Sequence, residues 1–406
     1  MTPERTSQRA PDGGDAPFTF HETPVLPAGF LCAARSCGLK PDGQPDLALF
    51  YSAVPAQAAA VFTRNLVPGA PIIVGREIIK KRRLRGIVVN SKVSNVGTGE
   101  EGIENARRMG AAAARELGVP VDEVLMSSTG VIGVRLPIER IEATLVGMAA
   151  ELQSDPLVAA RAIMTTDRVP KALSLSVGNA TLSAVGKGAG MIAPNMATML
   201  VYIFTDAELP PGAADPLLRA AVADSFNMLS VDTDTSTSDT CVLMANGLAG
   251  PVDEQAFAAA LKALCIRMAE MLARDGEGAS KLVRATVEGA RNVEEARRMA
   301  RSIVESPLVK TMAYGADPNV GRILMALGKC FECEIDPARL EIRIGDALVF
   351  ANGRRLDFED AAVRAILSGD PVDIRVDLRL GDGRATAFGC DLTPGYIEEN
   401  AAYYSS

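Results

Sequence analysis

Small hydroxyl residues and glycines gather in four short segments of the sequence, where packing alone would favour larger side chains. The segments are residues 127–133, 164–167, 186–200 and 232–240. Each of them by itself is typical of a loop closed by side-chain hydrogen bonds to the backbone. Together, the four segments indicate a polar and tightly turned active site.

The chemistry of such a site is limited by the single histidine, His21, which lies beside a polar N-terminal segment. Ser-His-Asp and Cys-His hydrolysis, and most zinc or iron sites, need a histidine inside the folded body. We therefore exclude these mechanisms, and we expect neither a metal centre nor a bound cofactor.

A threonine can act as a nucleophile without histidine if cleavage of its own preceding peptide bond makes it N-terminal. Its free α-amine then serves as the base, and a pKa of roughly 7.7 to 8.0 leaves much of that amine neutral near physiological pH. Thr198 suits this role because it follows the turn signal Pro194-Asn195 and precedes an apolar strand. The sequence therefore predicts cleavage between Ala197 and Thr198, with Thr198 as the nucleophile.

Two other interpretations of these segments fail on spacing. A phosphate-binding loop would need a glycine six residues before Lys187 and a serine or threonine after it, but Thr181 and Gly188 occupy those positions. The aspartates of residues 232–240 lack the glycine and the terminal glutamate of a calcium loop. We expect those aspartates to be half-buried and hydrogen-bonded instead.

Strand-like and helix-like patterns alternate along the chain, which predicts an α/β or α+β protein. Strands are predicted at residues 86–90, 123–127, 199–205, 241–245, 341–344, 373–380 and 384–390. Helices are predicted at residues 104–117, 138–152, 216–226, 254–273, 293–305 and 359–367. The basic run at residues 80–85 is predicted to be the solvated end of a helix that leads into a buried strand.

The composition narrows the class of protein further. The 406 residues include 42 Lys and Arg against 50 Asp and Glu, giving a net charge of −8, which argues against nucleic acid or an anionic membrane as a partner. Aromatic residues make up 4% and Trp is absent, so base-stacking platforms are not expected. We expect no signal peptide, because residues 1–18 lack an apolar segment, and no stretch approaches 18 apolar residues. With seven cysteines taken as reduced thiols, this predicts a cytoplasmic protein.

Seven motifs carry a resemblance to a known family. They are STGVIG, MTTD, KGAGMIAPNMATML, DTDTSTSDT, GEGASK, DPNVGRI and the terminal GCDLTPGYIEENAAYYSS. In this order they resemble the ornithine acetyltransferase family, the bifunctional glutamate N-acetyltransferases of arginine biosynthesis. The resemblance runs over residues 28–406, nearly the whole chain.

This resemblance implies an activity and a set of roles. Thr198 would take an acetyl group from N2-acetylornithine and pass it to glutamate by a ping-pong route. Thr129 and Gly130 would form the oxyanion hole. The family's substrate-binding positions fall on Thr165, Lys187, Thr198, Glu277, Asn400 and a C-terminal serine, Ser405 or Ser406. The two self-cleaved fragments would stay together and assemble as a heterotetramer with two copies of each.

The resemblance also implies a fold. It predicts a layered αββα-type sandwich that carries the self-cleaved nucleophile, with a smaller second αβ domain. The expected division is a disordered tail at 1–20, a catalytic domain at 21–285, a smaller domain at 286–380 and a C-terminal segment at 381–406 that returns to the active site.

The chain departs from the family pattern at positions that bear on substrate choice. Residues 90–95 read NSKVSN where the family usually has NSGNAN, so Lys92 replaces a glycine and Val93 an asparagine. Ser238 lies in a TSTSD variant that resembles the acetyltransferase homologues of clavulanic acid clusters. These departures keep two alternatives open. One is an acyltransferase or amidohydrolase of specialised metabolism with another amino-acid substrate, and the other is an uncleaved, non-catalytic binding subunit.

Overall fold

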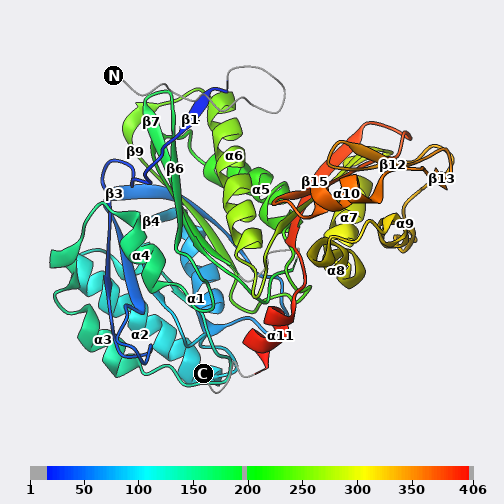
Figure 1. Cartoon of the computed structure of the whole chain (residues 1–406). Coiled ribbons are helices and arrows are strands. Elements are labelled where there is room, and N and C mark those ends of the chain that lie inside the picture. Colours follow the sequence, from blue (N-terminus) through cyan, green and yellow to red (C-terminus); the bar gives the residue numbers. More distant parts are fainter. Residues whose placement is uncertain (1–15, 194–198, 402–406) are drawn as a thin grey trace, which may run out of the picture.

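The computed structural model describes residues 16–193 and 199–401. In this part of the chain there are two mixed sheets, one of nine strands and one of six, and helices cover each of them (Figure 1). The larger sheet has the order β1-β6-β7-β8-β9-β3-β4-β5, with β2 also paired to β3. Its strands are β1 (Phe18–Phe20), β2 (Phe30–Arg35), β3 (Leu47–Phe62), β4 (Arg83–Asn90), β5 (Val124–Ser128), β6 (Lys171–Val177), β7 (Ala180–Lys187), β8 (Leu200–Glu208) and β9 (Thr240–Pro251).

The larger sheet folds over on itself at β3. The first half of this 16-residue strand pairs with β2 and β4, and the second half pairs with β9, with a register shift between Tyr51 and Ala56. The two halves of the larger sheet, one with β4 and one with β8 and β9, face each other across an apolar layer. In this layer the ring of Phe50 lies 5.3 Å from that of Tyr202 and 5.1 Å from that of Phe204.

Helices cover both outer faces of the folded sheet. The face of β4 and β5 packs against α1 (Ala70–Ile78), α2 (Gly99–Leu117) and α3 (Ile138–Leu145), while the face of β7 to β9 packs against α5 (Ala214–Ala223) and α6 (Glu254–Arg274). The buried stripe of α6 includes Phe257, Leu261, Leu264 and Met268, spaced three or four residues apart. This spacing places the stripe on one face of a helix. Helix α4 (Pro156–Ala162) contacts β2 and β3, and its alanines join the apolar layer of Phe50 and Phe204.

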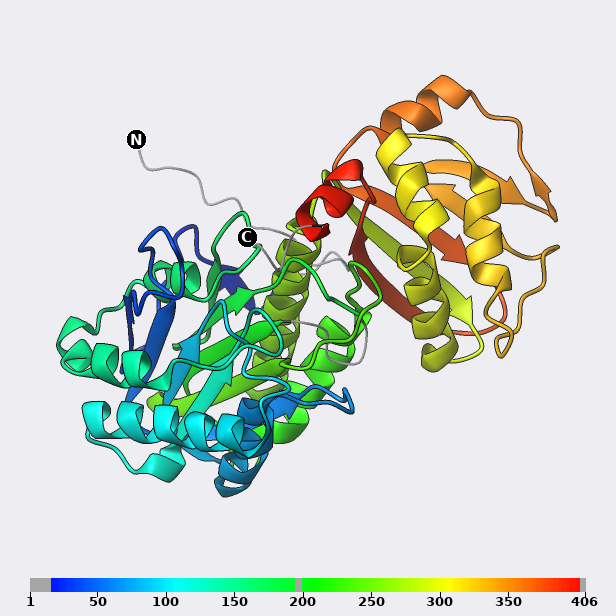
Figure 2. The same cartoon turned by 90° about the horizontal axis from the view of Figure 1, so that it is seen from below.

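The second sheet belongs to a separate lobe (Figure 2). Its order is β13-β12-β11-β14-β10-β15, formed by β10 (Leu282–Ala290), β11 (Glu341–Ile344), β12 (Ala347–Ala351), β13 (Arg354–Arg355), β14 (Val372–Asp377) and β15 (Gly383–Cys390). The lobe also contains α7 (Val293–Val304), α8 (Pro307–Gly315), α9 (Val320–Gly328) and α10 (Asp360–Leu367). After β15, α11 (Pro394–Asn400) returns to the loop that follows α6.

The mixed α/β class predicted from the sequence is confirmed, and each of the seven predicted strands overlaps a strand of the structure. The helix predicted at 138–152 is wrong in its second half. There α3 ends at Leu145, and Met148–Glu151 forms a 3-10 turn after Gly147, which has a left-handed backbone. The tail predicted up to residue 20 is also wrong at its end, because β1 pairs with β6.

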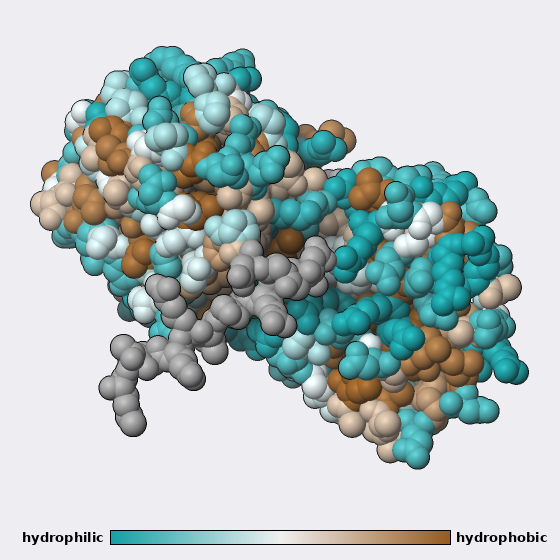
Figure 3. All heavy atoms as spheres, turned by 90° about the horizontal axis from the view of Figure 1, so that it is seen from above, coloured by the Kyte–Doolittle hydropathy of each residue, from teal (hydrophilic) through white to brown (hydrophobic). Residues whose placement is uncertain are grey.

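The basic run lies where it was predicted. After α1, the exposed 3-10 turn Ile79–Lys81 leads into β4, whose later residues are buried. Within the described residues no helix is both long enough and apolar enough to span a membrane. On the face seen in Figure 3, hydrophobic residues are scattered among hydrophilic ones on both lobes.

Candidate active site

Lys187 is the point where three predicted residues meet. It is the last residue of β7 and is 3% exposed. Its Nζ donates a hydrogen bond to Oγ1 of Thr165 at 2.7 Å and lies 3.5 Å from Oγ1 of Thr129. Because Thr129 follows β5 and Thr165 follows α4, the fold brings together hydroxyl groups from two distant segments around one buried ammonium.

Asp167 supplies the charge that balances Lys187, and its role was not predicted from the sequence. Its Oδ2 lies 3.8 Å from Nζ of Lys187, and its Oδ1 accepts hydrogen bonds at 2.7 Å from Nζ of Lys171 and from the N–H of Gly188. Burial opposes ionisation, but the two lysines prevail and hold the pKa of Asp167 well below its usual range. Burial lowers the pKa of Lys187, and Asp167 counteracts that effect.

The backbone at Gly130 is fixed by close approach to another chain segment. The N–H of Thr129 donates to the carbonyl of Asn90 at 3.1 Å, and the N–H of Val131 donates to the carbonyl of Lys92 at 3.0 Å. Gly130 has a φ of 131°, and a side chain there would overlap the backbone of Lys92. Only glycine fits this position. The N–H of Gly130 makes no hydrogen bond within the described residues, so it is available to a ligand.

Glu277 and Asn400 form a second polar pair at the other end of the glycine-rich segment. The Nδ2 of Asn400, at the end of α11, donates to Oε2 of Glu277 at 2.7 Å. The N–H of Glu277 donates to the carbonyl of Ala189 at 2.9 Å, and a side chain at Gly190 would overlap the carboxylate. The negative charge of Glu277, like that of Asp167, opposes the lowering of the Lys187 pKa by burial, which links the two ends of the site.

Four of the predicted residues, Ala197, Thr198, Ser405 and Ser406, lie outside the described residues. The chain is described again from Met199, whose N–H donates to Oδ1 of Asp239 at 3.1 Å. Leu200 then pairs with Lys187 in the β7–β8 ladder.

The aspartates of residues 232–240 were predicted to be half-buried and hydrogen-bonded. This is confirmed for Asp232, but the burial is wrong for Asp234, which is exposed, and for Asp239. Asp239 is completely buried, and burial raises its pKa well above the usual value. Asp232 accepts hydrogen bonds from the N–H groups of Met191 and Ile192, and burial raises its pKa to about 6. These two aspartates therefore fix the described residues on both sides of the segment that contains Thr198.

The arrangement can bind a molecule that carries both charges. The ammonium of Lys187, with two hydroxyl groups beside it, is suited to a carboxylate. The carboxylate of Glu277, with the amide of Asn400, is suited to an amino group. Within residues 16–193 and 199–401, no cluster of His, Cys, Asp and Glu suits a metal ion.

Comparisons with known proteins agree with the motifs. The ArgJ family model matches residues 31–405. The glutamate N-acetyltransferase Oat2 of Streptomyces clavuligerus is 46% identical over 389 residues, which cover 94% of this chain and 98% of that protein. The arginine biosynthesis bifunctional protein ArgJ 2 of Clostridium acetobutylicum is 44% identical over 381 residues, covering 93% of this chain and 98% of that protein.

Two solved structures are also similar in sequence. The bifunctional protein ArgJ of Bacillus halodurans is 40% identical, with a TM-score of 0.48, and the match covers 50% of this chain and 98% of that chain. The ornithine acetyltransferase of Mycobacterium tuberculosis, complexed with ornithine, is 34% identical, with a TM-score of 0.41. That match covers 44% of this chain and 98% of the solved chain. From the family model and the near full-length relatives, the chain belongs to the ArgJ family.

Proposed function

We propose that this chain transfers an acetyl group from N2-acetylornithine to glutamate through an acetyl ester on Thr198. Its family and its 46% identity to Oat2 over nearly the full chain make it a glutamate N-acetyltransferase. The observation that supports the residue-level proposal is the meeting of Thr129, Thr165 and Lys187. Lys187 is at the end of β7, where it pairs with Leu200. Leu200 is two residues after Thr198 in the sequence.

The substrates would bind by their charges. Lys187 pairs with the carboxylate of the amino acid, and Glu277 with Asn400 takes an amino group. Ser405 or Ser406 completes the substrate site in this proposal. The low exposure of Lys187 and Glu277, 3% and 8%, makes such pairing stronger than it would be in bulk water.

In the proposed reaction the base, the nucleophile and the oxyanion donors all belong to this chain. The α-amine of Thr198 accepts the proton of its own hydroxyl, and Oγ attacks the acetyl carbonyl of N2-acetylornithine. The hydroxyl of Thr129 and the N–H of Gly130 stabilise the negative oxygen of the tetrahedral intermediate. The C–N bond then breaks, and ornithine leaves with the proton. The amine of glutamate attacks the acetyl ester in the second half, which releases N-acetylglutamate and restores Thr198.

Cleavage before Thr198 would leave the fold intact in this proposal. Strand β7 precedes the predicted cut and β8 follows it, and their antiparallel ladder extends from Leu182 paired with Thr205 to Lys187 paired with Leu200. The β3–β9 ladder also joins the two sides of the cut. These ladders support a self-processing αββα sandwich whose fragments stay together. The heterotetramer with two copies of each fragment is proposed from the family resemblance alone.

We place the smaller domain in the second lobe. β15 belongs to that lobe's sheet because it pairs with β10, and α11 then reaches the contact between Asn400 and Glu277. The C-terminal segment predicted at 381–406 would therefore serve both the lobe and the substrate site.

Replacing Lys187 with methionine is expected to weaken all amino-acid substrates by a similar factor. The variant leaves a substrate carboxylate without its partner, which should lower kcat/KM roughly 10- to 100-fold. Steady-state rates with N2-acetylornithine as donor and with glutamate as acceptor measure the effect. Lys80→Met, at an exposed position, is the matched control and should not change them. Unchanged kcat/KM in Lys187→Met would remove Lys187 from the substrate site.

Lys92 and Val93 test which amino acid is accepted. Lys92 has a φ of 71°, a conformation that favours glycine, and its carbonyl accepts the N–H next to Gly130. The double variant Lys92→Gly, Val93→Asn alters charge and volume beside the oxyanion position. We expect the ratio of kcat/KM between glutamate and competing amino-acid acceptors to change by about tenfold.

The control for this double variant is Arg379→Gly, which relieves a left-handed residue with a φ of 54° in the second lobe. That ratio should stay constant in the control. An equal ratio before and after the double change would show that the segment does not select the acceptor, and it would remove the alternative of another amino-acid substrate based on these residues.

A further inference from the structure

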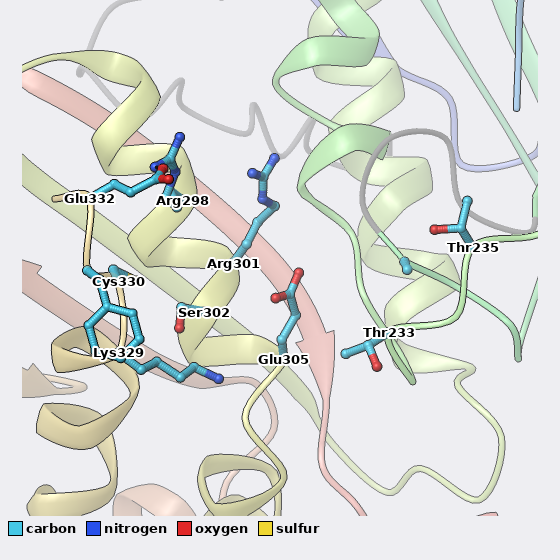
Figure 4. Close-up of a pocket in the computed structure, with 11 residues that line it drawn as sticks. Thr233, Thr235, Arg298, Arg301, Ser302, Glu305, Lys329, Cys330 and Glu332 are labelled. Carbon is cyan, nitrogen blue, oxygen red and sulfur yellow. Dashed lines mark hydrogen bonds and ion pairs between the residues drawn. The ribbon is translucent and has the colours of Figure 1, made fainter. Parts of the chain in front are cut away.

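A cleft of about 520 Å³ lies outside the site described above. One wall is formed by α7 and the end of α9, and the opposite wall by Thr233 and Thr235 (Figure 4). Ala193 also lines the cleft. None of the lining residues is shared with the Lys187 and Glu277 site, so the cleft needs its own explanation.

Three charged groups in this cleft lack a close ion pair or side-chain hydrogen bond among the residues that the structure describes. Arg298 forms an ion pair with Glu332. The side chains of Arg301, Glu305 and Lys329 form no ion pair or hydrogen bond within those residues. Arg301 and Glu305 stand four residues apart at the end of α7, and both project into the cleft (Figure 4).

The position of Glu305 is costly by itself. It is the residue that ends α7, where the negative end of the helix dipole disfavours a carboxylate. It is also partly buried, and burial raises its pKa although Arg301 and Lys329 lower it. A positively charged group next to Glu305 would offset both effects.

The charges of the cleft balance when the helix ends are included. α7 and α9 both end here, and each end carries roughly half a negative charge. With Glu305 they offset Arg301 and Lys329, which leaves the cleft close to neutral but with separated charges. A phosphate or a dicarboxylate would face Glu305 with a like charge, and a polyamine would leave both cations unpaired. A neutral ligand with separated charges fits better.

We propose that this cleft is a second binding site for a free α-amino acid in its zwitterionic form. The carboxylate of the ligand pairs with Arg301, and its ammonium lies at Glu305. Phe331 lines the cleft and is 93% exposed, which provides an apolar contact for the ligand side chain. Thr233 and Thr235 supply hydroxyl groups on the opposite wall.

A ligand in the cleft would contact a loop that is hydrogen-bonded to the start of the strand after Thr198. Thr233 and Thr235 belong to the loop in which Asp232 holds the N–H groups of Met191 and Ile192 and Asp239 holds the N–H of Met199. One short loop therefore connects the cleft wall to the residues on both sides of residues 194–198.

Calorimetric titration of the wild-type protein with L-leucine, L-glutamate and L-arginine tests the proposal. At least one of them should bind the wild type with one more site per chain than it binds Glu305→Gln. Arg301→Gln should weaken the same site about tenfold or more. Glu294→Gln is the matched control, since Glu294 lies on α7, pairs with Arg297 and does not line the cleft. It should bind as the wild type does.

Blocked ligands separate this site from a simple ion site. The N-acetyl derivative and the methyl ester of the binding amino acid should each bind the cleft about tenfold more weakly or worse. The proposal is overturned if the site count of Glu305→Gln equals that of the wild type, or if inorganic phosphate binds the cleft as tightly as the amino acid. Melting temperatures of the variants identify any loss of folding, and acetyl transfer is assayed separately.

Discussion

Thr198→Ala protein is expected to remain one chain of 406 residues and to have no measurable acetyl transfer. The hydroxyl of Thr198 is the proposed nucleophile both for cleavage of the preceding bond and for acceptance of the acetyl group. The wild type should instead separate under denaturing conditions into residues 1–197 and 198–406. Denaturing electrophoresis and N-terminal sequencing measure the first effect, and transfer from N2-acetylornithine to glutamate measures the second.

Thr198→Ser is the control for this result, because serine keeps a hydroxyl group at the same position. It should cleave and retain transfer, whereas the alanine variant should do neither. Active wild-type protein without a new N-terminus at Thr198 would contradict the proposed mechanism. A fully uncleaved, inactive wild type would favour the non-catalytic binding subunit instead.

Thr129→Val is expected to lower kcat about 100- to 1,000-fold, which corresponds to roughly 2.7 to 4 kcal/mol of transition-state stabilisation. Valine keeps the shape of threonine but cannot donate a hydrogen bond to the tetrahedral oxygen. The effect should fall mainly on kcat, because the lost interaction is made in the transition state. Steady-state kinetics and the melting temperature together separate this loss from a loss of folding.

Thr144→Val provides the matched control on α3, where the hydroxyl donates to the carbonyl of Arg140 at 2.8 Å. That variant removes a threonine hydroxyl away from the site and should keep its turnover. If Thr129→Val turned over as fast as the control, Thr129 would have no part in stabilising the oxyanion.

Segments with a strong local pattern were predictable from the sequence. The apolar stripe of α6 and the continuous apolar run of β8 each identify their element without help from the rest of the chain. β3 was missed because its 16 residues include Pro55 and many alanines, which are poor strand formers. It forms a strand because different partners bind its two halves, and such tertiary pairing overrides local preference.

The candidate site follows the same division. Its hydroxyl-rich and glycine-rich segments stood out because small residues are unusual where packing dominates. The network of buried charges around Asp167 could not be recognised in the sequence. Lys171 is completely buried between Asp167 and Asp275, and it lies 104 residues from Asp275 in the sequence. A single sequence contains no sign of such a pairing, so the role of Asp167 as the partner of two buried lysines could be recognised only from the fold.

The central claim is that Thr198 carries the acetyl group between donor and acceptor. Mass spectrometry of the protein after incubation with N2-acetylornithine alone tests it most directly. The fragment that begins at Thr198 should be heavier by one acetyl group, located on that residue, and adding glutamate should remove it with formation of N-acetylglutamate. Transfer that proceeds at the normal rate while Thr198 stays unmodified, or an acetyl group found on another residue, would contradict the account.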